Sequence, residues 1–251
     1  MNIKTHLPLI IEAAREAGMA ILEIYNSDDF NVELKGDESP LTRADTAAHQ
    51  AIVKYLEKTE FPILSEEGRD IPFEERKNWA YFWMVDPLDG TKEFIKKNGE
   101  FTVNIALIHQ NEPVLGVVYA PVLDKLYFGG KGHGAYLTIN AGREQELKHI
   151  KNETGVVRIV ASRSHLNEDT KNFIDQFEKA ETVSMGSSLK FMLIAESKAD
   201  IYPRFAPTME WDTAAAHAVL RGLEIEVINN EDQQPLRYNK ENLLNPYFLV
   251  G

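Results

Sequence analysis

Acidic residues follow a predicted strand in a pattern that suits a hard metal ion and a phosphate group. A buried apolar run leads directly into Asp86, and Asp89 comes three residues later. Because Pro87 lacks a backbone donor and has a fixed φ, the strand is expected to end there. Gly90 and Thr91 then offer free amides at a predicted helix start, where anions bind readily. This arrangement predicts a metal and phosphate site; an Asp-rich turn with Asp89 as a cap is the structural alternative.

Three further acids stand where they could join this site. Asp45 shares the apolar stripe of a helix predicted over 42–58, and an inward-facing acid needs a partner. Glu66 follows a short apolar strand predicted over 62–65, and Asp212 precedes a helix whose alanines permit a close approach. Each acid also has a structural alternative, which is a helix cap for Asp45 and Asp212 and a solvated acidic loop for Glu66.

Convergence of Glu66, Asp86, Asp89 and Asp212 would create strong repulsion. Two like charges about 5 Å apart repel by about 3 kcal/mol at an effective dielectric constant of about 20. Divalent cations remove that repulsion, and a donor set made only of oxygen favours Mg²⁺ over zinc or copper. Bound cations also reverse the local sign of charge, so an acidic protein can hold a polyanionic substrate.

The elements that would position these acids are predicted from apolar periodicity. In the first part of the chain we expect helices over 7–24 and 42–58, strands over 62–65 and 81–85, and an antiparallel meander over 101–137. A polar stretch at 140–155 is the best candidate boundary, which predicts domains 1–153 and 154–251. In the second part we expect strands over 156–161, 182–185, 200–205 and 225–228, and helices over 168–179, 188–197 and 213–221. The fold class is therefore α/β, with an α+β first half.

Composition narrows the function classes. The 251 residues include no cysteine, which excludes disulfides, thiolate chemistry and zinc ribbons. A formal net charge of -12 argues against binding of nucleic acid polymers or anionic membranes. No apolar stretch is long enough to cross a membrane, and the N-terminus does not resemble a signal peptide. We therefore expect a cytoplasmic protein; the oligomeric state and peripheral membrane association stay open.

Four strings resemble the inositol monophosphatase superfamily of Mg²⁺-dependent, lithium-sensitive phosphomonoesterases. They are LTRAD at 41–45, LSEE at 64–67, DPLDGT at 86–91 and WDTAA at 211–215, in the order typical of that superfamily. Within it, the chain most resembles the bacterial-type 3′(2′),5′-bisphosphate nucleotidases. The supporting strings are GEFTVNIAL at 99–107, ASRSH at 161–165, GSSLKF at 186–191 and YPRF at 202–205.

The resemblance implies a layered α-β-α-β-α sandwich with the active site between the two halves, and a role for each matching residue. Two or three Mg²⁺ ions would be held by Glu66, Asp86, the carbonyl of Leu88, Asp89 and Asp212. Asp45 and Thr91 would orient and deprotonate the attacking water. Substrate contacts would come from Glu66, Leu88, Gly90, Thr91, Ser187, Lys190, Arg204 and Asp212. Without the resemblance, Lys190 and Arg204 are ordinary surface cations.

The implied reaction is hydrolysis of adenosine 3′,5′-bisphosphate to AMP and phosphate by in-line attack of a metal-activated water. An inositol or sugar phosphatase of the same superfamily, a non-catalytic nucleotide sensor and a structural acidic protein are the alternatives. The sequence leaves open the preference among the 3′,5′ and 2′,5′ isomers and the sulfated analogue. One departure from the superfamily pattern is Ala216, which stands where glycine is usual and could narrow the pocket.

Overall fold

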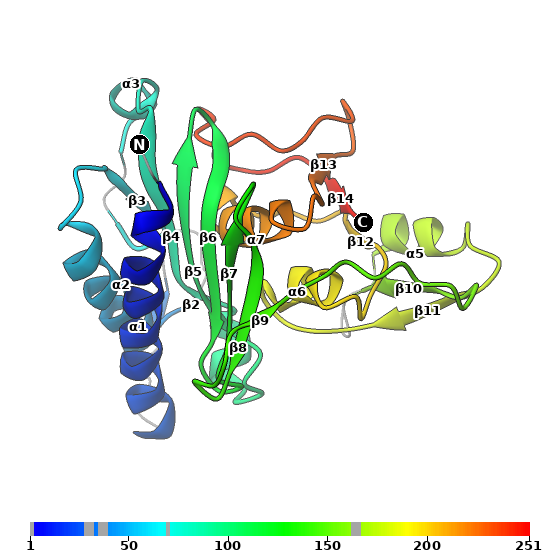
Figure 1. Ribbon diagram of the computed structural model, residues 1–251, viewed down its shortest axis with the longest axis horizontal. Coiled ribbons are helices and arrows are strands. Elements are labelled where there is room, and N and C mark those ends of the chain that lie inside the picture. The colour runs from blue at the N-terminus through cyan, green and yellow to red at the C-terminus, as the bar shows by residue number, and fades with distance from the viewer. Residues whose placement is uncertain (1–2, 28–32, 35–39, 69–70, 162–166) are drawn as a thin grey trace.

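The computed structural model describes residues 3–27, 33–34, 40–68, 71–161 and 167–251, which form five layers (Figure 1). Helices α1 and α2 form the first layer, a seven-stranded sheet the second, and α6 and α7 the third. Short strands form the fourth layer and α5 the fifth. This is the α-β-α-β-α sandwich expected from the resemblance.

Among the described residues, the helices are η1 (Ile3–His6), α1 (Leu7–Ser27), α2 (Arg43–Leu56), α3 (Phe73–Arg76), α4 (Thr91–Ile95), α5 (Glu168–Ile174), α6 (Leu189–Ala195) and α7 (Glu210–Arg221). The strands are β1 (Glu33–Leu34), β2 (Pro40–Leu41), β3 (Ile63–Ser65), β4 (Tyr81–Asp89), β5 (Thr102–His109), β6 (Glu112–Ala120), β7 (Lys125–Gly130), β8 (Gly134–Ile139), β9 (Gln145–Glu146), β10 (Val157–Val160), β11 (Ala180–Val183), β12 (Tyr202–Arg204), β13 (Val227–Asn229) and β14 (Phe248–Val250). In this part of the chain, no helix is both long and apolar enough to cross a membrane.

The large sheet is apolar on both faces because helices cover both. Its strand order is β3-β4-β5-β6-β7-β8-β9; β3 and β4 are parallel, and the remaining pairs form the predicted antiparallel meander. Along β4, Trp83 and Val85 pack in the core under α1 and α2, whereas Phe82 and Met84 pack in the core with α6 and α7. Alternation of side chains in a strand therefore explains the continuous apolar run.

The sequence predicts that the strand ends once it reaches Asp86 and Pro87. In the structure, β4 continues to Asp89. Asp86 pairs with Asn104 and Asp89 pairs with Thr102, so one extra residue lies in β4 between the two pairs. Such a bulge tolerates Pro87, because the residues inside it leave the regular hydrogen-bond ladder. The bulge keeps both aspartates next to β5.

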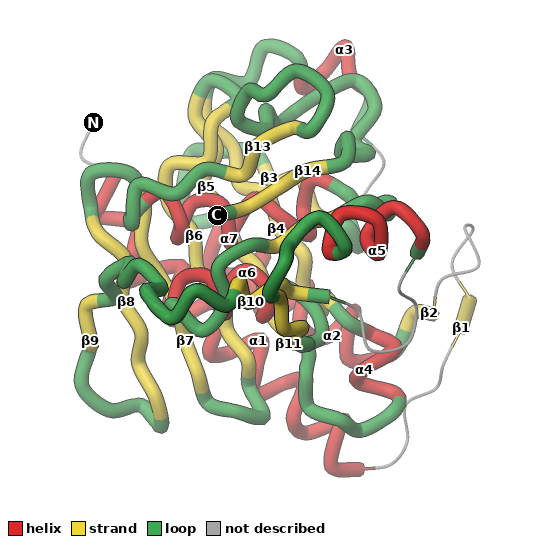
Figure 2. The backbone as a smooth tube through the Cα atoms, turned by 90° about the vertical axis from the view of Figure 1, so that its right-hand side faces the viewer, coloured by secondary structure: helices red, strands yellow, loops and turns green. Residues whose placement is uncertain are grey.

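The C-terminal half alternates strands and helices as predicted, with shifted boundaries. Strands β10 and β11 are parallel, β14 joins β12 to β13, and Ile159 bridges to Ile201 between the two sheets. Figure 2 views the molecule from this side. Strand β14 is not predicted from the sequence, and β9 places part of the predicted boundary at 140–155 in the first sheet. The division into domains 1–153 and 154–251 stays a prediction, and residues 162–165 of the ASRSH string lie outside the described residues.

Helix α7 packs very closely on the large sheet, as its alanines predict. A Cβ built on Gly116 of β6 would lie 2.2 Å from the carbonyl oxygen of Ala215 and 2.9 Å from the Cβ of Ala218. This contact sets the distance between the sheet and the helix that carries Asp212.

We expect Gly116→Ala to lower the free energy of unfolding by about 1–3 kcal/mol, because the new methyl forces α7 away from β6. Urea denaturation followed by circular dichroism measures the change. Gly132→Asn is the matched control: Gly132 has φ +76, which asparagine adopts readily, and a Cβ there has no atom of the described residues within 4 Å. Equal stability of the two variants would contradict the close approach of α7.

Candidate active site

Two parallel strand ends bring Glu66 and Asp86 together. Ser65 pairs with Val85, and the amide of Glu66 donates to the carbonyl of Val85 at 3.0 Å. Alternation along each strand then directs Glu66 and Asp86 to the sheet face that α7 covers. Asp86 is 1% exposed.

Asp212 reaches the same place from the start of α7. The sequence predicts a helix from 213, but α7 begins at Glu210, so Asp212 is its third residue rather than its cap. Its Oδ2 accepts from the amide of Met209 at 2.8 Å, which closes the first turn and explains the earlier start. Ligand atoms of Glu66, Asp86 and Asp212 all lie within 4.8 Å of one another.

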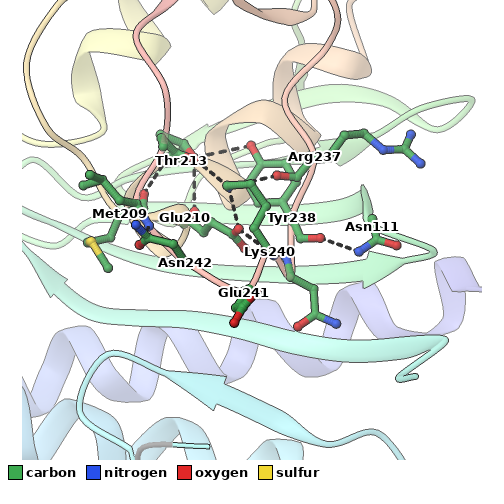
Figure 3. Close-up of polar contacts among 12 residues, drawn as sticks. Asn111, Met209, Glu210, Thr213, Arg237, Tyr238, Lys240, Glu241 and Asn242 are labelled. Atoms are coloured by element: carbon green, nitrogen blue, oxygen red, sulfur yellow. Dashed lines mark hydrogen bonds and ion pairs between the residues drawn. The ribbon is translucent and has the colours of Figure 1, made fainter. Parts of the chain in front are cut away.

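The first turn of α7 is held by a buried carboxylate, Glu210, as Figure 3 shows. Glu210 accepts from the amide of Asn239 at 2.5 Å, and from the amide and the Nζ of Lys240 at 3.0 and 2.5 Å. Burial raises the pKa of Glu210, and the charge of Lys240 opposes that rise. The Nδ2 of Asn245 donates to the carbonyl of Met209 at 2.8 Å. The segment at 239–245 thus fixes the turn that carries Asp212.

Burial and mutual repulsion make this acid group costly to ionise. The pKa of Asp86 is raised well above its ordinary value, first by burial and then by the charges of Glu66, Asp89, Asp212 and Asp45. Burial, followed by the charge of Asp89, raises the pKa of Asp212 to about 8. Without a cation, Asp212 therefore holds its proton near neutral pH, and burial and repulsion favour the protonated form of Asp86 in the same way.

The donor set fits a hard divalent cation. The Oδ1 of Asp86 accepts from the amide of Leu88 at 3.1 Å, whereas its buried Oδ2 has no hydrogen-bond partner among the described residues. A buried carboxylate oxygen without a donor is rare in folded proteins and is satisfied when a cation binds it. Carboxylate and carbonyl oxygens are the ligands that Mg²⁺ accepts.

Asp89 lies beside the compact group of three and is held by the C-terminal half. Its Oδ2 accepts from the Oγ of Ser187 at 2.7 Å, the Oγ of Ser188 at 2.8 Å and the amide of Ser188 at 2.6 Å. The predicted substrate contact Ser187 therefore has its hydroxyl engaged by Asp89. Ser188 was missed as a site residue, although the string GSSLKF contains it.

The structure brings Asp45 and Thr91 together, as the resemblance implies. The Oγ1 of Thr91 donates to the Oδ1 of Asp45 at 3.3 Å and lies 3.4 Å from the carbonyl of Leu88. The Oδ2 of Asp45 accepts from the amide and the hydroxyl of Thr42 at 2.8 and 2.6 Å. Asp45 is thus the capping acid of α2 and also the hydrogen-bond partner of Thr91, and its catalytic role stays a prediction.

Two adjacent cavities extend from the acids. One, of about 340 Å³, is lined by Asp89, Gly90, Ser187 and Asp212 among others; the second, of about 280 Å³, lies beyond it between α4 and β12. Both are lined by Glu93, Lys190, Tyr202 and Arg204. The side chains of Lys190 and Arg204 therefore line cavities beside the acids and do not lie on an open surface.

The structure also places the remaining residues singled out from the sequence. Gly90 has φ +95, a backbone conformation that favours glycine. Burial lowers the pKa of Lys190, and the charge of Asp89 opposes that change. The Nη2 of Arg204 donates to the carbonyl of Pro207 at 3.1 Å. Ala216 is 1% exposed and lines neither cavity.

Comparisons with known proteins agree with this geometry. A model of the inositol monophosphatase family matches residues 3–245. The 3′(2′),5′-bisphosphate nucleotidase CysQ of Escherichia coli (strain K12) is 44% identical over 250 residues, which cover 98% of this chain and 99% of that protein. The corresponding protein of Haemophilus influenzae is 37% identical over 248 residues, or 96% and 90% of the two chains.

Solved structures show the same fold. CysQ from Bacteroides thetaiotaomicron, a bacterial member of the inositol monophosphatase family, has a TM-score of 0.88 and 46% identity, covering 99% of this chain and 97% of that one. An inositol monophosphatase of Thermotoga maritima has a TM-score of 0.76 at 22% identity, covering 98% and 92%, and that likeness concerns the fold alone.

We expect the metal-free protein to lose stability as pH rises from about 4 to about 8, because its folded state holds protons on Asp86 and Asp212 that the unfolded chain releases. Excess Mg²⁺ should flatten this slope, since a cation favours the ionised carboxylates. Thermal unfolding in EDTA and in Mg²⁺ at several pH values measures both. The pKa of Glu210 is also raised, but Glu210 contributes the same pH dependence of stability in EDTA and in Mg²⁺, so the difference between the two buffers reports on the acid site.

Asp86→Asn provides the control, because its amide oxygen still accepts from Leu88 but carries no charge. We expect a shallower slope in EDTA and little response to Mg²⁺. Identical slopes of the unmodified protein in the two buffers would contradict a cation site at these acids.

Proposed function

This chain belongs to the inositol monophosphatase family, and from that premise we propose that it is a 3′(2′),5′-bisphosphate nucleotidase. It is a phosphoric monoester hydrolase that converts adenosine 3′,5′-bisphosphate and water into AMP and inorganic phosphate. One observation carries the proposal. Three carboxylates lie within 4.8 Å of one another beside cavities lined by Lys190 and Arg204, a site for cations next to a site for a second phosphate.

We propose that two or three Mg²⁺ ions are the cofactor. These ions would be held by the carbonyl of Leu88 and by four carboxylates, those of Glu66, Asp86, Asp89 and Asp212. The strongest support is the buried Oδ2 of Asp86, which has no hydrogen-bond partner among the described residues. When bound, such ions lower the pKa of water and neutralise charge on the phosphate and the leaving oxygen.

Asp45 and Thr91 are proposed to handle the proton of the attacking water. The Thr91 hydroxyl accepts that water's hydrogen bond and passes its own proton to the Oδ1 of Asp45, 3.3 Å away. Thr42 holds the other oxygen of Asp45 with two donors, so Oδ1 stays directed at Thr91. General-base assistance of this kind contributes about 10²–10⁴-fold in rate.

The substrate is proposed to lie along the two cavities. The amides of Gly90 and Thr91 would hold the reacting phosphate, and Ser187 lines the same cavity. Lys190 and Arg204 would bind the second phosphate, and the planar guanidinium of Arg204 suits a bidentate contact. The positive charges of Lys190 and Arg204 explain how a chain of net charge -12 would bind a polyanion. A cytoplasmic location stays a prediction, as does the absence of nucleic acid partners.

We predict that kcat/KM for adenosine 3′,5′-bisphosphate exceeds that for inositol 1-phosphate by about 10²–10⁴-fold, because two charge-assisted contacts to the second phosphate are lost with the smaller substrate. Phosphate release in Mg²⁺ measures both, with EDTA and Li⁺ as inhibited controls. Preference for inositol 1-phosphate would assign a sister phosphatase, and tight nucleotide binding without release would assign a sensor.

Thr91→Val should lower kcat by about 10²–10⁴-fold with little change in Mg²⁺ affinity, because it removes only the hydroxyl that links water to Asp45. Thr91→Ser keeps the hydroxyl and should retain most turnover. Steady-state kinetics and circular dichroism of the two variants test this. Full turnover by Thr91→Val would exclude the proposed proton path.

A further inference from the structure

Two buried polar residues lie directly opposite the paired aspartates on the neighbouring strand. In the register of β4 and β5, Asn104 is the partner of Asp86 and Thr102 is the partner of Asp89. Asn104 is 1% and Thr102 0% exposed. Both stand on the sheet face directed at the C-terminal half, since they alternate with residues of the opposite core. Apolar residues fill most of this face, so the two polar side chains call for an explanation.

Their polar atoms connect the sheet to the turn before α6. The Nδ2 of Asn104 donates to the Oγ of Ser188 at 3.0 Å, and its Oδ1 lies 3.1 Å from the Oγ1 of Thr102. The same Thr102 oxygen lies 2.6 Å from the Oγ of Ser187. Because the single proton of Ser187 is directed at Asp89, the Thr102 hydroxyl donates to Ser187, and the network crosses from the N-terminal half to the C-terminal half.

The network ends on one oxygen of Asp89. An amide nitrogen can only donate, so the Oγ of Ser188 accepts from Asn104. The proton of Ser188 is then directed at the Oδ2 of Asp89 and the carbonyl of Asp212, each at 2.8 Å. Ser187 donates to the same Oδ2 at 2.7 Å. Three donors thus occupy Oδ2, which leaves Oδ1 as the oxygen of Asp89 that a cation would meet.

The turn that carries the serines is held in an unfavourable conformation. Ser187 has φ +54, a region that costs a residue with a side chain about 1–2 kcal/mol. The amide of Gly186 donates to the Oε2 of Glu100 at 2.8 Å. Strain of this kind persists only where the surroundings impose it. Here the surroundings are the hydroxyls and amides that direct both serines at Asp89.

We propose that Thr102 and Asn104 are positioning residues that act through Ser187 and Ser188 to orient Asp89 for binding a divalent cation. The inference rests on the proposed function, because that function makes Asp89 a metal ligand. Partners that orient metal ligands typically change metal affinity by about 10–100-fold when they are removed. The arrangement also makes the cation site depend on correct contact between the two halves.

Mg²⁺ titration calorimetry of the full-length, EDTA-treated and dialysed protein tests the proposal without any substrate. Thr102→Val and Asn104→Leu should bind Mg²⁺ about 10-fold or more weakly, and Thr102→Ser should restore most of the affinity. Thr138→Val is the matched control: Thr138 is also buried in the large sheet, and its hydroxyl accepts from Arg15 at 3.3 Å, away from the acids. It should bind Mg²⁺ as the unmodified protein does.

A double-mutant cycle separates positioning from a loss of structure. If Asn104 acts through Ser188, Asn104→Leu combined with Ser188→Ala weakens Mg²⁺ binding no more than the stronger single variant does. The inference would be overturned if the losses of Mg²⁺ affinity in the two single variants multiplied in the double variant. It would also be overturned if Thr102→Val bound Mg²⁺ normally, or if Thr138→Val lost as much affinity. Urea denaturation checks each fold, and the Thr102 series decides if Asn104→Leu does not fold.

Mg²⁺ binding by the unmodified protein distinguishes failure of the proposed function from failure of this inference. Absence of Mg²⁺ uptake by that protein would refute the proposed function and this inference together. Normal uptake, with variants that bind equally well, would refute only the role of Thr102 and Asn104.

Discussion

Burial of several like charges in one small volume is the constraint on which the rest of this structure depends. Glu66, Asp86 and Asp212 come from three segments, yet their ligand atoms lie within 4.8 Å of one another. Repulsion and lost hydration oppose that arrangement. A fold can sustain it only by holding protons there, as the raised pKa values of Asp86 and Asp212 indicate, or by binding cations.

The fold meets this constraint with neutral donors. Asp86 accepts from the amide of Leu88, Asp212 from the amide of Met209, and Asp89 from Ser187 and Ser188. Hydrogen bonds of this kind orient a carboxylate without cancelling its charge, whereas a bonded lysine or arginine would compete with a cation. The acids are therefore held in place while their charge stays available.

Packing between the layers transmits this order. Glycine at 116 lets α7 approach the sheet, and the buried Glu210 fixes the first turn of that helix. Asn104 and Thr102 connect the same sheet to the turn before α6. The site therefore forms only when α7 and the turn before α6 are correctly packed on the sheet.

The sequence by itself determined the local features of this protein. Apolar periodicity predicted α1, α2, the antiparallel meander and the strand that carries Asp86, because burial of a strand or helix face depends on nearby residues. The string DPLDGT and the other acidic strings identified Asp45, Thr91 and the candidate metal ligands. Tertiary structure alone decided the bulge at Pro87, the start of α7 at Glu210, and the network of Ser188, Asn104 and Thr102. These features depend on hydrogen bonds between segments far apart in the chain, and no local pattern records which distant donor will meet a given carboxylate.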